Sequence, residues 1–142
     1  MAGPYEDGDA AYNKGDYATA MRLWRPLADQ GNVYAQSWLG VMYRDGQGVP
    51  QDYAQAVSWY RKAADQGYAL AQFNLGIMYS NGQGVPQDYI QAHMWWNLAA
   101  SRHTDPMKRA DAVKSRDIVA AKMNTAQIGE AQRLASAWKP KL

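Results

Sequence analysis

Residues 46–53 read Gly-Gln-Gly-Val-Pro-Gln-Asp-Tyr, and residues 82–89 read the same. The two stretches are 36 positions apart, and at this shift residues 31–66 match residues 67–102 at twenty of 36 positions. A repeat of this period is typical of a solenoid, in which each unit buries its apolar face only against its neighbours. We therefore expect an extended binding surface rather than a closed catalytic pocket.

Each repeat is predicted to form two helices. In the first copy, apolar residues at spacings of three and four predict one helix over 33–45 and a second helix that begins after Asp52. The glycines and the proline of 46–50 interrupt the helical pattern between them. The second copy predicts the same pair of helices over 69–81 and 88–101.

A shorter helix pair precedes the two repeats, within residues 4–30. Its second helix, 16–29, matches the repeats at the 36-residue shift, whereas its first helix, 4–14, does not. Tyr12 stands 31 positions before Tyr43 instead of 36. This spacing predicts that the turn inside the first pair is five residues shorter than the loops of the repeats.

The C-terminal residues leave the repeat pattern. They predict a helix over 105–123 with Asp105 as its cap, and a last helix that opens with a capping box of Asn124 and Gln127. A non-repeating amphipathic end is what a solenoid needs to close its last apolar face. We therefore predict a single repeat domain over 1–142, made of a shortened pair at 4–30, repeats at 31–66 and 67–102, and capping helices at 103–142.

The charges are unevenly distributed along the chain. Residues 1–100 carry six Lys and Arg against nine Asp and Glu, whereas residues 101–142 carry nine against four. Basic residues interleaved with acidic ones on helices indicate a solvated face more than a nucleic-acid site, so nucleic acid is the less favoured partner. The chain has no Cys, and no apolar run reaches the roughly 18 residues of a membrane span. Thiol catalysis, disulfides and a membrane span are therefore not expected.

No combination of residues predicts catalysis. His93 and His103 are the only histidines, and neither an HExxH motif nor a paired-histidine spacing occurs. The Gly-x-Gly loops lack the third glycine and the Lys-Ser/Thr of a phosphate-binding loop. We therefore expect a protein that is not an enzyme, with no catalytic residues, no cofactor and no metal.

The ordered motifs Ala-x-x-x-Leu-Gly-x-x-Tyr, Gly-x-Gly-Val-x-x-Asp-Tyr, Ala-x-x-Trp and Ala-Ala-x-x-Gly resemble the Sel-one-like repeat family. That family is the longer-looped branch of the tetratricopeptide-repeat superfamily, and the match covers residues 16–100. The resemblance implies an all-α fold, a right-handed α-solenoid of antiparallel helix pairs with C-terminal capping helices. One departure lies at the exit of the last repeat, where Arg102 replaces Gln66 and the closing glycine is missing.

In the tetratricopeptide-repeat superfamily, the first helix of each pair lines a concave groove. The resemblance therefore implies a partner-binding groove on the first helices of the two repeats, at positions that differ between the copies. Its predicted residues are Tyr34, Ser37, Trp38, Val41, Arg44, Asp45, Leu70, Phe73, Asn74, Ile77, Ser80 and Asn81. The share of the first pair would come from Glu6, Asn13 and Lys14.

The chemistry of these positions suits a peptide or a helix. Tyr34, Trp38 and Val41 lie on one helical stripe, next to Phe73 and Ile77 of the following repeat. Large apolar side chains with a polar rim are typical of protein-binding surfaces. The alternative is that Trp38 packs against the adjoining helix as part of the core.

These observations favour a non-enzymatic adaptor that binds a protein or peptide partner in the groove. The alternative is a cell-envelope regulatory protein that binds a glycan or a peptide, and a homodimer through the first helix pair is a further hypothesis. The start Met-Ala-Gly-Pro resembles a mature end behind an added Met. It predicts a periplasmic or secreted bacterial protein after removal of a signal peptide, with the cytoplasm as the alternative.

Overall fold

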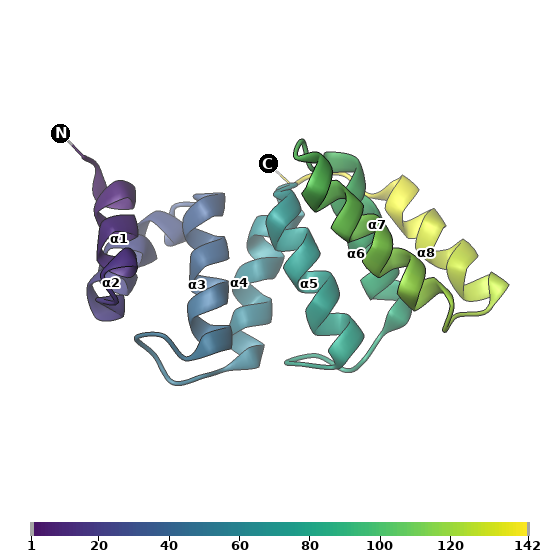
Figure 1. The fold of residues 1–142 in the computed structure, drawn as a ribbon, viewed down its shortest axis with the longest axis horizontal. Helices are drawn as coiled ribbons and strands as arrows, with labels where there is room; N and C mark the ends of the chain where they lie inside the picture. The colour runs from purple at the N-terminus through teal and green to yellow at the C-terminus, as the bar shows by residue number, and fades with distance from the viewer. Residues whose placement is uncertain (1, 142) are drawn as a thin grey trace. The chain divides into compact units, whose positions relative to one another are not determined.

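The computed structural model describes residues 2–141, and it is all-helical within that range, as the sequence predicts (Figure 1). None of the described helices is long and apolar enough to cross a membrane. The helices are α1 (Pro4–Asn13), α2 (Tyr17–Asp29), α3 (Val33–Asp45), α4 (Tyr53–Asp65), α5 (Ala69–Asn81), α6 (Tyr89–Arg102), α7 (Pro106–Ala120) and α8 (Thr125–Ala137).

The long loops that follow α3 and α5 have the same conformation, as their identical sequences predict. Gly46 and Gly82 end the two helices with φ angles of 69° and 67°, in the left-handed region that glycine adopts at little cost. In the first loop the Asp52 amide then donates to the Tyr43 carbonyl at 2.8 Å, and the equivalent bond in the second loop is 3.0 Å long. These loops therefore fix the start of each second helix relative to the end of the first.

Within both repeats, a glycine of the first helix lies under an aromatic ring of the second. A Cβ on Gly40 would lie 2.5 Å from carbons of the Tyr60 ring, and a Cβ on Gly76 would lie 2.6 Å from the Trp96 Nε1. Heavy atoms cannot approach so closely, so only glycine fits at either position. In each repeat, the backbone of the first helix therefore packs directly against an aromatic ring of the second helix.

The first pair makes the same contact through Gly8 and Trp24, since a Cβ on Gly8 would lie 2.7 Å from the Trp24 Cδ1. The first pair and the second repeat also have an equivalent hydrogen bond. Trp24 Nε1 donates to the Tyr5 carbonyl at 3.1 Å, and Trp96 Nε1 donates to the Phe73 carbonyl at 3.1 Å. Each carbonyl belongs to the residue three positions before the glycine.

This contact corrects the predicted register of the first pair. Gly8 corresponds to Gly40 at a shift of 32, so the first turn is four residues shorter than the loops of the repeats (36 − 32 = 4). The prediction of five residues, based on Tyr12 and Tyr43, is wrong because α1 aligns by its glycine. In the corrected register, Tyr12 corresponds to Arg44.

The first helix of each repeat also bonds to the helix before it. Gln36 Nε2 donates to the Ala28 carbonyl at 3.1 Å, and Gln72 Nε2 donates to the Ala64 carbonyl at 3.2 Å. Both bonds are buried, and each adds a second donor to a carbonyl in the last turn of a helix that also accepts the amide of the following glycine, Gly31 or Gly67.

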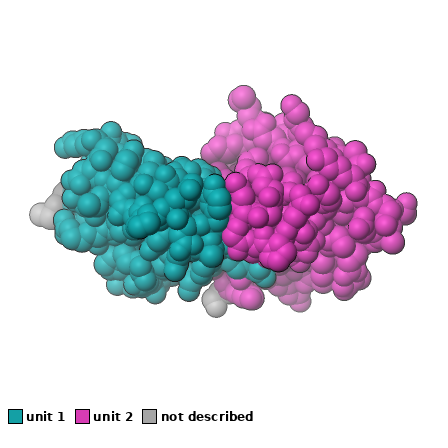
Figure 2. Space-filling view, turned by 90° about the horizontal axis from the view of Figure 1, so that it is seen from below, with its two compact units in different colours: residues 1–63 teal, residues 64–142 magenta. Residues whose placement is uncertain are grey.

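The chain divides into two compact units, residues 1–63 and residues 64–142 (Figure 2). In the first unit, α2, α3 and α4 supply a core cluster of Ala20, Trp24, Ala28, Ala35, Leu39, Met42 and Trp59. In the second unit, α6 and α7 supply two neighbouring clusters, one of Ala92, Trp96 and Val119 and one of Ala99, Ala100 and Ala112. The repeats therefore provide both cores, and α7 completes the second.

The two C-terminal helices begin as predicted. The Asp105 carboxylate caps α7 by accepting the first amides of the helix, and Asn124 and Gln127 form the predicted capping box of α8. The helix predicted over 105–123 ends at Ala120, because turn-type hydrogen bonds follow that residue and lead into the next cap.

Candidate functional site

The residues predicted on α3 differ in how much they offer to a partner. Tyr34 is 52 % exposed and Val41 is half-buried. Arg44 and Asp45 form a surface ion pair with a Nε–Oδ1 distance of 2.9 Å. Ser37 is only 5 % exposed, so it offers almost no surface to a partner, unlike the exposed position that the sequence predicts. Neighbouring helices cover α3 on several sides, and six of its thirteen residues are buried.

Trp38 packs mainly into the core of the first unit. Its ring is stacked on Trp24, with centroids 5.3 Å apart and planes inclined by 15°. Its Nε1 donates to the Tyr5 hydroxyl at 3.1 Å, and the Tyr12 ring lies 4.7 Å from it, centroid to centroid. These contacts favour the core alternative for Trp38, although the side chain stays partly exposed.

Tyr5 and Tyr12 are surface positions that were missed from the sequence. In the corrected register they correspond to Ser37 and Arg44, and both are half-buried. Tyr12 also donates its hydroxyl to Gln47 Oε1 at 2.9 Å. An alignment by glycine rather than by tyrosine would have found both positions. The residues predicted there instead, which are Glu6, Asn13 and Lys14, are all exposed.

The six residues predicted on α5 all keep part of their surface exposed, and they are Leu70, Phe73, Asn74, Ile77, Ser80 and Asn81. Phe73 and Ile77 pack with one side against Trp96 and Val119. The α5 face therefore combines apolar side chains that are held in place by the core with amides and a hydroxyl beside them.

Two small clefts adjoin the first turn of α5. One has a volume of ≈ 230 Å³ and is lined by Leu70, Phe73, Asn74, His103, Lys108 and Asp111. The other also has a volume of ≈ 230 Å³ and is lined by Gly67, Tyr68, Ala69, Leu70, Arg102, His103, Thr104 and Lys108. Three residues of the predicted binding surface, Leu70, Phe73 and Asn74, therefore lie close to the start of α7. Leu70, His103 and Lys108 line both clefts.

The two histidines lie apart, both in the second unit. His93 is buried, with no partner for its Nδ1, and burial together with the nearby Arg116 charge lowers its pKa. Burial also lowers the pKa of His103, and the Lys108 charge acts in the same direction. In the described part of the chain, no group of three His, Cys, Asp or Glu residues could hold a metal ion.

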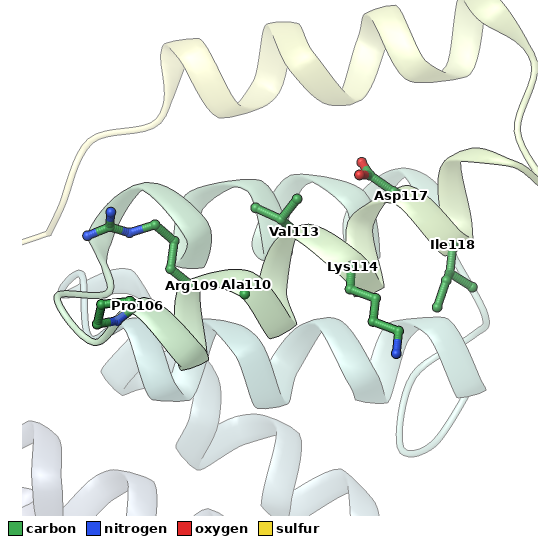
Figure 3. Close-up of a pocket in the computed structure, with 7 residues that line it drawn as sticks. All are labelled: Pro106, Arg109, Ala110, Val113, Lys114, Asp117 and Ile118. Carbon is green, nitrogen blue, oxygen red and sulfur yellow. The ribbon is translucent and has the colours of Figure 1, made fainter.

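A wide, open pocket of ≈ 700 Å³ lies along one side of α7 (Figure 3). Its lining residues come from successive turns of that helix and are Pro106, Arg109, Ala110, Val113, Lys114, Asp117 and Ile118. Ile118 is 55 % exposed, and Met107 on the same helix is 79 % exposed. α7 therefore covers the core with one side and leaves apolar groups in solvent on another.

Solved structures share this architecture, whereas no curated protein matches the chain. The chain matches c5321, a protective antigen of uropathogenic Escherichia coli strains that displays an SLR fold, with a TM-score of 0.87 and 30 % identity over 95 % of its length. It also matches a Sel1 repeat protein from Oxalobacter formigenes, with a TM-score of 0.74 and 30 % identity, and this match too covers 95 % of the present chain. It covers 29 % of the first protein's chain and 56 % of the second's, and so spans less than two thirds of either.

The family comparison agrees with the period of the sequence. The family model of the Sel1 repeat matches three successive stretches, residues 1–32, 33–68 and 69–103. Together they take up most of the chain, and the helix pairs and the shared loop conformation are those expected from the resemblance. The chain therefore belongs to the Sel1 repeat family.

Proposed function

We propose that this chain is a non-enzymatic adaptor that binds a protein or peptide partner through the exposed sides of α3 and α5. Sel1 repeats are protein-interaction modules. The main support is that buried and exposed positions on these helices differ in how far the two copies agree. Ala35, Gln36, Leu39, Gly40 and Met42 are buried, and so are the identical residues 36 positions later. The residues that differ between the copies lie mostly on the exposed sides.

The exposed side chains have the composition of a binding surface. On α5, Phe73 and Ile77 offer partly exposed apolar surface beside Asn74 and Asn81. On α3, Tyr34 offers a half-exposed ring on the same helix as the Arg44 ion pair. Apolar anchors that are surrounded by polar groups are the usual arrangement of residues that dominate protein binding.

Site-specific photo-crosslinking tests this function in the cells that produce the protein. A photoreactive amino acid at Tyr34 or at Asn81 should capture one partner protein. The same amino acid at Arg22 on α2 or at Gln132 on α8, both exposed, provides the matched control. Equal capture from the control positions would contradict the proposal.

The purified partner then allows a quantitative test. Phe73→Ala together with Asn74→Ala should raise the Kd at least about tenfold, because anchor residues typically contribute more than 1 kcal/mol each. The double variant Arg22→Ala/Gln132→Ala should leave the Kd unchanged. A partner whose affinity is the same for both double variants would not bind through α5.

A further inference from the structure

A polar cleft in the second unit gathers the positions at which the repeats differ around the start of α5. Its volume is ≈ 230 Å³, and Tyr68, Arg102 and His103 are among its lining residues. Tyr68 stands where the preceding repeat has Asn32, and Arg102 and His103 stand where that repeat ends in Gln-Gly. These substitutions change both the hydrogen-bond donors and the charge of one small site.

The first of these changes removes a helix cap. At α3, the Asn32 Oδ1 accepts the Ala35 amide at 2.9 Å. At α5, Tyr68 occupies the N-cap position, and no side-chain capping bond is made. The amides of a first helical turn have no partner within the helix, and they carry the positive end of the helix dipole. Ala69 and Leu70, which open α5, line the cleft.

The second change adds positive charge. Arg102 is held in place, since its Nε donates to the Gly67 carbonyl at 2.7 Å and its guanidinium carbon lies 5.3 Å from the centre of the Trp138 ring. Lys108 reaches the cleft from the first turns of α7. Two acidic residues are nearby, Asp111, which lines the adjoining cleft, and Asp105, whose charge acts on His103, but neither lines this cleft.

His103 is a separate sign that the cleft accepts a polar ligand. Its side chain lines both clefts and is only 9 % exposed. No described residue forms a hydrogen bond with its imidazole, and the charged groups near it are Lys108, Asp105 and Arg109. Its ring nitrogens keep some exposure to solvent, so the hydrogen-bond partner that the protein does not supply can come from the clefts. A ligand in the cleft would supply that partner.

We infer that this cleft binds the free C-terminal carboxylate of a peptide partner that ends in an apolar residue. The carboxylate accepts from the α5 amides and pairs with Arg102 and Lys108. The terminal side chain enters the adjoining cleft, where it contacts Leu70 and Phe73. The clefts share Leu70, His103 and Lys108, so one ligand with an anionic and an apolar group fills both. This inference rests on the proposed function, because α5 supplies both surfaces.

Nuclear magnetic resonance of the ¹⁵N-labelled full chain tests the inference with defined probes. Acetyl-alanyl-alanyl-leucine with a free carboxylate should shift the amide signals of Ala69, Leu70 and Ala71. The same tripeptide with a C-terminal amide should bind at least tenfold more weakly. Equal binding of the two tripeptides, or no shift with either, would overturn the inference. Inorganic phosphate is the third probe, and phosphate binding without tripeptide binding would also overturn it.

Three substitutions assign the binding to these residues. Lys108→Met and Arg102→Gln should each weaken binding of the free-carboxylate tripeptide about tenfold. Lys114→Met, on α7 like Lys108, should leave binding unchanged. Tyr68→Asn should restore the cap seen at α3, and so weaken the tripeptide without lowering the thermal midpoint. A loss of binding in Tyr68→Asn at an unchanged thermal midpoint cannot reflect unfolding. Unchanged binding in both Tyr68→Asn and Lys108→Met would contradict the site.

The outcome can be separated from that of the proposed function. If a partner is captured at Tyr34 or Asn81 and amidation of its C-terminus leaves the Kd unchanged, the carboxylate inference fails and the adaptor function stands. If specific capture fails at both positions, the proposed function fails whatever the tripeptides do.

Discussion

Glycine at positions 8, 40 and 76 allows an aromatic ring of the second helix to reach the backbone of the first in all three helix pairs. Glycine in a helix interior is unfavourable by about 1 kcal/mol relative to alanine. At all three positions a larger residue would collide with the ring, so we expect the close approach to offset this cost. The contact is therefore expected to outweigh intrinsic helix propensity.

Gly76→Ala should lower the free energy of unfolding by about 1–3 kcal/mol, because the new Cβ would be forced against the Trp96 ring. Urea denaturation measures the change. Gly129→Ala in α8 is the matched control, since nothing lies within 4 Å of a Cβ at that position. It should raise stability by about 0.5–1 kcal/mol. Equal stabilisation by both substitutions would show that the helices are further apart than described.

Trp38→Ala should lower the free energy of unfolding by about 3 kcal/mol, because the indole stacks on Trp24 and bonds to Tyr5. Tyr34→Ala, one turn earlier on the same helix, should lower stability by much less than Trp38→Ala, because Tyr34 is 52 % exposed and its ring contacts Tyr5 at the edge of the core. Urea denaturation of both variants provides the comparison. If Trp38→Ala kept full stability and lost only partner binding, Trp38 would belong to the binding surface instead of the core.

Among the elements, α6 and α7 carry an acid-sensitive contact. Burial and then the Arg116 charge lower the pKa of His93, and Asp117 acts in the opposite direction. A histidine with a lowered pKa binds fewer protons in the folded state than in the unfolded state, at pH values between its folded pKa and its ordinary value of about 6.5. Its neutral form therefore favours folding above about pH 6.5, and stability falls as the pH drops below that value.

His93→Val, which restores the Val57 of the preceding repeat, should reduce this dependence on pH. Urea midpoints measured from about pH 7.5 to pH 5 should fall less steeply for the variant than for the unmodified chain. Some slope should remain, because the pKa of His103 is lowered as well. A slope that His93→Val leaves unchanged would assign the acid sensitivity to other groups.

The elements were also the part of the fold that the sequence predicted best. The duplicated loop and the apolar spacing placed the helices, since a glycine turn, an Asp cap and a helical period are local signals. The register of the first pair could not be read in this way, because a glycine marks it and Tyr12 offers a false match. The cleft at α5 was missed because Tyr68 and Lys108 meet only in space.

At the scale of the whole chain, the two units use the same repeat for different surfaces. In the first unit, Tyr5, Tyr12 and Trp38 fill the space beside α3 with aromatic rings. In the second unit, clefts remain open beside Leu70 and Phe73. The shared residues thus build a common scaffold, and the differing residues decide which face stays accessible to a partner.

Truncation after residue 103 tests whether α7 and α8 act as the cap of the repeats. In the second unit, Val119 packs with Trp96, and Trp138 lies 6.4 Å from Trp95, centroid to centroid. Removing residues 104–142 would expose the rings of Trp95 and Trp96. The terminal repeats of a solenoid need a polar outer face for solubility. The truncated chain should therefore melt at a lower temperature and form aggregates in light scattering. A chain ending at residue 138 is the control, because among the described residues it loses the ion pair of Lys141 with the partly buried Asp65 and a backbone bond between the same residues. This control keeps both capping helices and Trp138, so it should stay monodisperse. If the chain ending at residue 103 melted like the control and stayed monodisperse, the repeats would be stable without their cap.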